Sequence, residues 1–151
     1  MTPNWIRTAR QEDLSRREVQ PDADILLIEN DHDIADMYAF GLKAHGFAVS
    51  VAASRDSARE RLNVAERNPG VIVLDAAFRH RIGLRILDEL RESPTTADVP
   101  VIVLVDDTQD SMEAYRHGAT DCHARFRTTP KELVSYVTAA LKGGAARAKT
   151  L

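Results

Sequence analysis

Three short, continuous apolar runs constrain the fold of this chain most strongly. They are ILLI at 25–28, VIVL at 71–74 and VIVLV at 101–105. Each contains β-branched residues, is bounded by charged residues or turn formers, and shows no alternation of apolar and polar positions. Strands with this pattern are covered by helices on both faces of a parallel sheet, whereas alternation indicates one solvated face. The runs therefore predict buried strands of an α/β sheet.

Two weaker strands and a series of helices complete the pattern. FAVSVAA at 47–53 alternates, as expected near a sheet edge, and 121–125 is a fifth strand candidate. Five helices are predicted between and after the strands. The first spans 32–45 and ends before Gly46, and the second begins after Ser54, buries Ala58, Leu62 and Ala65, and ends before Asn68. The third is marked by Leu84, Leu87 and Leu90, the fourth by Met112 and Tyr115, and the fifth begins at Thr129 and Pro130. This (βα)5 order predicts a doubly wound, five-stranded parallel sheet with right-handed crossovers and the common strand order 2-1-3-4-5.

The composition indicates one soluble domain. The chain has 151 residues, 44% hydrophobic and 28% charged, and its net charge of -3 gives no reason to expect a nucleic-acid or membrane partner. The single cysteine excludes an intramolecular disulfide, and together with the lack of a signal-peptide core it favours a cytoplasmic location. We expect residues 1–22 to be a flexible or frayed helical extension, or an arm that docks Trp5. Residues 23–143 would form the domain and 144–151 a flexible tail.

Acidic residues follow two of the predicted strands. Glu29, Asn30 and Asp31 end the first strand, and Asp75 ends VIVLD. In a doubly wound sheet, ligands bind beyond the carboxyl ends of the strands where the strand order reverses, between the first and third strands. A single acid after a strand is often only a loop residue or a helix N-cap. Two acidic strand ends at this point predict a shared site for a hard cation and a phosphoryl group.

These residues carry a family resemblance. From about residue 23 to 143 the chain resembles the receiver domain of two-component response regulators, in the CheY-like superfamily with its flavodoxin-like fold. ILLIEND resembles the first strand and acidic pair of the family, VIVLD the strand that ends in its phosphoacceptor, and Gly83-Leu84 the start of its third helix. PVIVLV and GATDCHARF resemble its fourth and fifth strands.

The resemblance implies a signalling module rather than an enzyme, with at most slow self-phosphorylation from a phosphodonor. Asp75 would accept a phosphoryl group from a histidine kinase or phosphotransfer protein and pass the signal to a downstream protein. Mg²⁺ would be the cofactor, held by Glu29, Asn30, Asp75 and the backbone carbonyl of Ala77. A homodimer through the fourth helix, fifth strand and fifth helix is a further expectation.

Two departures weaken the expected metal site and switch. Asn30 stands where the family has a second acidic ligand, and its amide oxygen can coordinate a metal ion but brings no charge. Asp31 is an alternative ligand, although the side chain of a neighbouring residue in an extended strand points elsewhere. Val105 replaces the family Ser or Thr whose hydroxyl binds the phosphoryl oxygen. A hydrogen bond to a charged group contributes about 1.5 to 3 kcal/mol, comparable with the gap between two switch states. Its loss predicts weak coupling between phosphorylation and conformation.

Departures from the family pattern in the last strand also indicate an altered switch. The family Lys-Pro reads Arg125-Phe126, and the rigid fork of an arginine can lock onto a carboxylate such as Asp75, in place of metal or phosphate. Cys122 occupies the position of the switching aromatic residue and is expected to pack as a small apolar group. Two hypotheses about function remain. The chain is either a phosphorylatable response regulator with Arg125 as charge clamp, or a pseudo-receiver that signals by protein contacts alone. A flavodoxin-like cofactor binder is disfavoured, because acids follow the first strand.

Overall fold

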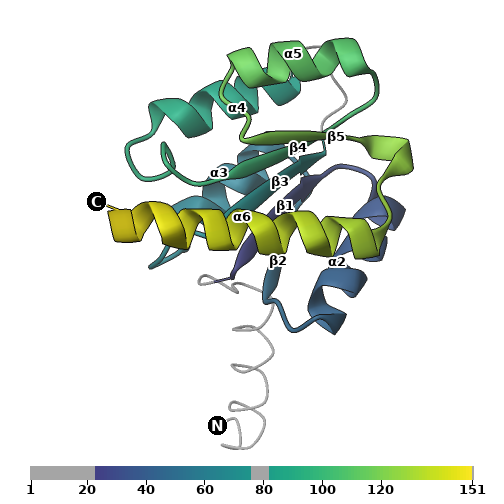
Figure 1. Ribbon diagram of the computed structural model, residues 1–151, viewed down its shortest axis with the longest axis horizontal. Coiled ribbons are helices and arrows are strands. Elements are labelled where there is room, and N and C mark those ends of the chain that lie inside the picture. The colour runs from purple at the N-terminus through teal and green to yellow at the C-terminus, as the bar shows by residue number, and fades with distance from the viewer. Residues whose placement is uncertain (1–22, 76–81, 151) are drawn as a thin grey trace, which may run out of the picture.

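The computed structural model describes residues 23–75 and 82–150. Residues 1–22, 76–81 and 151 lie outside the described residues. Within the described part, five parallel strands form one sheet in the order β2-β1-β3-β4-β5 (Figure 1). The strands are β1 Ile25–Glu29, β2 Val49–Ala52, β3 Val71–Asp75, β4 Val101–Val105 and β5 Asp121–Ala124. The predicted α/β class, parallel sheet and strand order are confirmed.

Helices alternate with these strands. They are α2 His32–Ala44, α3 Arg55–Val64, α4 Ile82–Glu92, α5 Thr108–Arg116 and α6 Pro130–Thr150, with the 3-10 helix η2 Arg125–Arg127 directly after β5. α3 ends at Val64, earlier than the stop expected at Asn68. α6 runs past residue 143, where the sequence predicted the domain to end. The division into extension, domain and tail stays a prediction. No helix of the described residues is long and apolar enough to cross a membrane.

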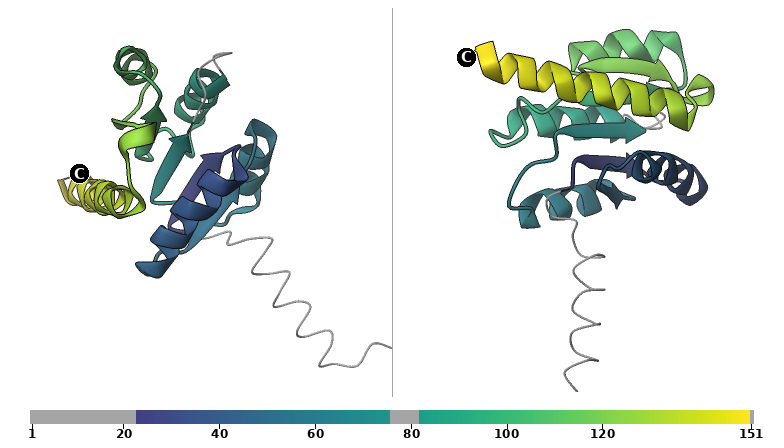
Figure 2. Two further views of the ribbon diagram at one scale, coloured as in Figure 1. Left: turned by 90° about the vertical axis from the view of Figure 1, so that its right-hand side faces the viewer. Right: turned by 60° about the horizontal axis from the view of Figure 1, so that its bottom comes forward.

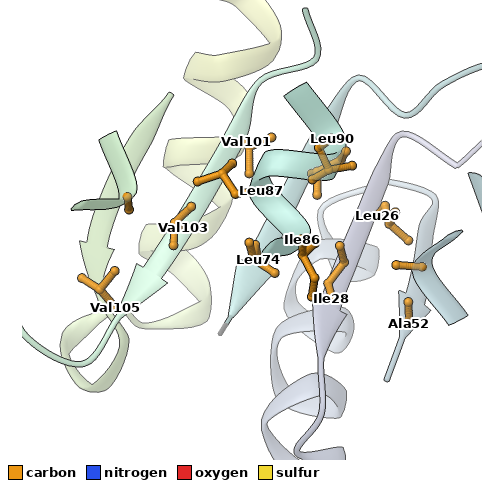
Figure 3. Close-up of a cluster of buried hydrophobic side chains, with 13 residues drawn as sticks. Leu26, Ile28, Ala52, Leu74, Ile86, Leu87, Leu90, Val101, Val103 and Val105 are labelled. Carbon is orange, nitrogen blue, oxygen red and sulfur yellow. The ribbon is translucent and has the colours of Figure 1, made fainter. Parts of the chain in front are cut away.

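The strands send alternate side chains into two apolar layers, one on each face of the sheet. Helices lie on both sides of the sheet (Figure 2). The first layer packs strand residues against α3, α4 and α5 (Figure 3), and it consists of Leu26, Ile28, Ala52, Ala58, Ile72, Leu74, Ile86, Leu87, Leu90, Val101, Val103, Val105 and Ala114. The second packs against α2 and α6, with Ile25, Leu27, Val49, Val71, Val73, Ile102 and Leu104 from the strands. Helices therefore cover both faces, which explains why the central strands are continuously apolar.

The N-cap of α3 and the glycine after α2 lie where the sequence predicts them, whereas the buried face of α5 does not. The Ser54 hydroxyl accepts a hydrogen bond from the Ser57 N–H at 3.0 Å and caps α3. Gly46, with φ of +98°, follows α2 in a conformation that a β-carbon would strain. In α5, however, Met112 and Tyr115 are 63% and 47% exposed, and Ala114 is the residue that enters the core. The apolar residues that marked this helix therefore lie on its outer side.

Candidate functional site

The carboxyl ends of β1 and β3 bring Glu29 and Asp75 side by side. The two residues are partners in the parallel register of these strands. Both are buried, at 1% and 4% exposure, because β1 and β3 are central strands covered on both faces. The two acidic strand ends therefore lie side by side, and their use as a binding site stays a prediction. Two carboxylates in such a place repel each other unless a cation or a proton neutralises them.

Arg125 supplies a positive charge to this pocket. Its side chain is only 15% exposed, and its Nε lies 3.1 Å from Asp75 Oδ1. Its Nη2 lies 3.9 Å from Glu29 Oε1. Its Nη1 lies 3.6 Å from Oδ1 of Asp106, the residue that follows β4. The contact with Asp75 is an ion pair without hydrogen-bond alignment, since neither Nε nor Oδ1 has a hydrogen-bond partner among the described residues.

Neighbouring groups hold Arg125 in place. The hydroxyl of Tyr38, from α2, donates to the carbonyl of Thr128 at 2.8 Å and lies 3.4 Å from the carbonyl of Arg125. The Thr128 hydroxyl donates to the Ala124 carbonyl at 2.7 Å, which closes the η2 turn. Burial, followed by the charges of the two site carboxylates, raises the pKa of Tyr38 to about 12, so this donor keeps its proton. Tyr38 thus ties the turn that carries Arg125 to α2.

The surroundings of Asp75 favour its protonated form. Burial raises the pKa of Asp75 most, and the neighbouring Glu29 raises it further. Arg125 acts in the opposite direction but is outweighed, and the resulting pKa of Asp75 is about 9. Asp75 therefore ionises less readily than an exposed aspartate does.

Of the other expected metal ligands, Asn30 directly follows Glu29 at the end of β1 and is exposed. The Asp31 carboxylate is the N-cap of α2 and accepts from the N–H groups of Asp33 and Ile34 at 3.0 and 3.1 Å. Ala77, whose carbonyl was the fourth expected ligand, lies outside the described residues.

A divalent cation at this site would have to share the two carboxylates with Arg125. Glu29 Oε2 and both Asp75 oxygens are buried without hydrogen-bond partners in the described chain, which would suit a cation. A guanidinium, however, already lies beside both carboxylates. No group of three or more His, Cys, Asp or Glu side chains within residues 23–75 and 82–150 is arranged to hold a metal ion.

Val105 belongs to the hydrophobic core. It is 2% exposed and lies in the same apolar layer as Val101 and Val103, on the face covered by α4 and α5 (Figure 3). Its side chain carries no hydroxyl, and its alternation with Leu104 turns it away from the layer in which α2 packs. The position therefore contributes packing and offers no hydrogen bond to a phosphoryl group.

Asp106 is a site residue that the sequence reasoning missed. Its signal was an acid directly after a continuous apolar strand, the same pattern that identified Asp75. Cys122 packs partly buried against the first core layer, as expected, and burial raises the pKa of its thiol to about 11. Phe126 is 79% exposed, and the guanidinium carbon of Arg125 lies 5.4 Å from its ring centroid.

Comparison with known proteins agrees with this fold. The response regulator receiver domain family matches residues 25–143, so the chain belongs to this family. The phosphate regulon transcriptional regulatory protein PhoB of Escherichia coli is 31% identical over 120 residues, which cover 78% of this chain and 51% of PhoB. The chain thus spans about half the length of PhoB. A 14.6 kDa protein from the sodA1 3' region of Leptolyngbya boryana is 32% identical over 117 residues, covering 76% and 86% of the two chains.

Solved structures of receiver domains share the architecture. The receiver domain of NtrX from Brucella abortus is 28% identical, covers 79% of this chain and 98% of its own, and has a TM-score of 0.69. The receiver domain of the Francisella response regulator 1452 is 26% identical, covers 78% and 95%, and has a TM-score of 0.67. The chain is accordingly a receiver domain of two-component signalling. Such domains are generally non-enzymatic modules that interact with histidine kinases or phosphodonors and with effectors, and they typically bind Mg²⁺ at the phosphorylation site.

Proposed function

We propose that the chain is a response-regulator receiver domain in which Asp75 accepts a phosphoryl group. The observation that supports this is the position of Asp75 at the carboxyl end of β3, beside Glu29 of β1. A histidine kinase or a phosphotransfer protein would be the donor. An oxygen of Asp75 would attack the phosphorus of a phosphohistidine, the P–N bond would break, the imidazole would leave, and an acyl phosphate would form.

The same residues support a weakened switch. Val105 is buried among apolar neighbours and has no hydroxyl with which to bind the phosphoryl group. Arg125 is engaged with Asp75 and Glu29 before any phosphoryl group arrives. Phosphoryl transfer depends mainly on positioning and charge neutralisation, so an acid pair with one cation can still react slowly. We expect slow phosphorylation and a small conformational response.

A second function, signalling through protein contacts without phosphorylation, is favoured by a separate observation. Arg125 Nε already lies 3.1 Å from Asp75 Oδ1, and burial raises the pKa of that carboxyl group, which disfavours the nucleophilic carboxylate. The contact surface would be formed by α5, β5 and α6, where Met112 and Tyr115 are exposed apolar residues. This surface could bind a downstream protein or a second copy of the chain.

Intact mass measurement separates the two functions. Wild type, Asp75→Asn and the surface control Asp36→Asn are incubated with an acyl phosphate donor and Mg²⁺, and the mass of each protein is followed with time. Phosphorylation of Asp75 predicts that wild type and Asp36→Asn gain one phosphoryl group and that Asp75→Asn gains none. No gain in wild type would select the phosphorylation-independent function, and a gain in Asp75→Asn would show that the acceptor is another residue.

A further inference from the structure

We propose that Arg125 is a built-in cation of the acidic site, which holds Glu29 and Asp75 together in the resting domain without a divalent metal ion. It would stand where the family typically binds Mg²⁺. The inference concerns the resting state and does not depend on whether Asp75 is phosphorylated. Its test therefore uses no phosphodonor.

The contacts of the guanidinium support this role. Its three nitrogens each lie within 4 Å of a different carboxylate: Nε at 3.1 Å from Asp75, Nη1 at 3.6 Å from Asp106 and Nη2 at 3.9 Å from Glu29. These acids come from the ends of three neighbouring strands, β1, β3 and β4. A single side chain thus contacts all three acidic strand ends, as a bound ion would, and it cannot lose its charge by deprotonation.

The guanidinium is also positioned from two sides. Tyr38 contacts the backbone of the turn that carries it, through the hydroxyl that also binds the Thr128 carbonyl. Phe126 places its ring 5.4 Å from the guanidinium carbon, within the range of a cation–π interaction. Phe126 is the residue next to Arg125, so the two departures from the family Lys-Pro pair act together. A preorganised arginine loses less conformational entropy on pairing than a free flexible side chain does.

The loss of metal ligands is consistent with this replacement. Asn30 is uncharged and exposed, and the carboxylate of Asp31 is occupied in capping α2. Glu29 and Asp75 are the two acids that stay in the pocket, and Arg125 contacts both. A divalent cation would have to enter beside the guanidinium, and repulsion between like charges disfavours this. The site should therefore be insensitive to Mg²⁺ until the arginine is removed.

Titration with MgCl2 tests the inference. Isothermal titration calorimetry and thermal unfolding are carried out on wild type, Arg125→Ala and Arg127→Ala. Arg127 is an exposed arginine of the same 3-10 helix, so its variant loses the same charge outside the pocket. We expect Arg125→Ala to bind Mg²⁺ about ten-fold or more tightly than wild type, the range over which one neighbouring charge shifts an ionisation equilibrium. Arg127→Ala should bind as wild type does.

Mg²⁺ binding by the three proteins can support or overturn the role of Arg125. Wild type that binds Mg²⁺ as tightly as Arg125→Ala would overturn the proposal, as would an equal gain in Arg127→Ala. If Arg125→Ala lacks a cooperative unfolding transition in a chelator, the same transition is measured with MgCl2 added. Recovery of folding by Mg²⁺ would support the proposal, and folding that the ion does not restore would overturn it. A failure to detect phosphorylation of Asp75 leaves these expectations unchanged.

Discussion

Replacement of Asp75 by asparagine should stabilise the domain, and the gain should grow with pH. Asparagine has nearly the same shape but cannot ionise, so it removes the penalty of keeping a buried acid next to Glu29. The pKa of Asp75 is raised from its ordinary 3.8 to about 9 by folding. The folded state therefore binds this proton more tightly than the unfolded chain does. Wild type should lose stability relative to Asp75→Asn as the pH rises from the lower value towards the higher one.

The magnitude follows from these two pKa values. Each unit between the unfolded pKa and the working pH costs about 1.36 kcal/mol, which amounts to about 4 kcal/mol at pH 7 and roughly 1.5 kcal/mol at pH 5. The raised pKa already includes the effect of Arg125, so no separate correction for that contact is made. We therefore expect Asp75→Asn to be more stable than wild type by about 4 kcal/mol at pH 7 and by roughly 1.5 kcal/mol at pH 5.

Urea unfolding followed by circular dichroism, at both pH values and with a chelator present, measures this difference. Asp36→Asn is the control, because Asp36 is an exposed residue of α2 and is not among the groups that shift the pKa of Asp75. The stability of this variant relative to wild type should be the same at both pH values. A stability difference between wild type and Asp75→Asn that is the same at pH 5 and pH 7 would refute the reasoning, because it would show that folding does not shift the pKa of Asp75.

Three further predictions concern the surroundings of the site. Val105→Thr places a hydroxyl in an apolar layer and should cost about 1 to 3 kcal/mol in urea unfolding, while it should enlarge any structural response to phosphorylation seen by NMR. An unchanged response would argue against Val105 as the cause of weak coupling. Tyr38→Phe removes the hydrogen bond to Thr128 and should cost about 1 kcal/mol by the same assay, whereas full stability would show that the hydroxyl does not secure the turn. Cys122, whose thiol pKa is raised from 9.0 to about 11, should be alkylated about 100-fold more slowly at pH 8.5 than in the urea-unfolded chain, and equal rates would contradict its burial.

The strands could be predicted from local sequence patterns, and their order in the sheet from general rules of α/β topology. Continuous β-branched runs report burial on both faces, and a (βα)5 order restricts the sheet to a few topologies. The same rules brought Glu29 and Asp75 together, since parallel strands open their carboxyl ends on one edge. The buried face of α5 could not be predicted in this way. Met112 and Tyr115 indicated a helix, but a helix of nine residues is too short for its pattern to show which face contacts the sheet, and the buried residue is Ala114.

The electrostatic centre of the site depends on tertiary structure that no local pattern contains. Arg125 could be suspected as a clamp for Asp75 from its position in the family motif. Its approach to Asp106 depends on the η2 turn and on the contact with Tyr38, which is 87 residues away along the chain. The role of Asp31 could not be predicted for a different reason. An acid before a helix can be an N-cap as readily as a metal ligand, and here Asp31 caps α2.

A crystal structure of wild type grown with MgCl2 tests the central claim most directly. If Arg125 is the cation of this site, its guanidinium will lie between Glu29 and Asp75, with no metal ion coordinated by either carboxylate. A magnesium ion bound to both carboxylates, with the arginine turned out of the pocket, would contradict the account.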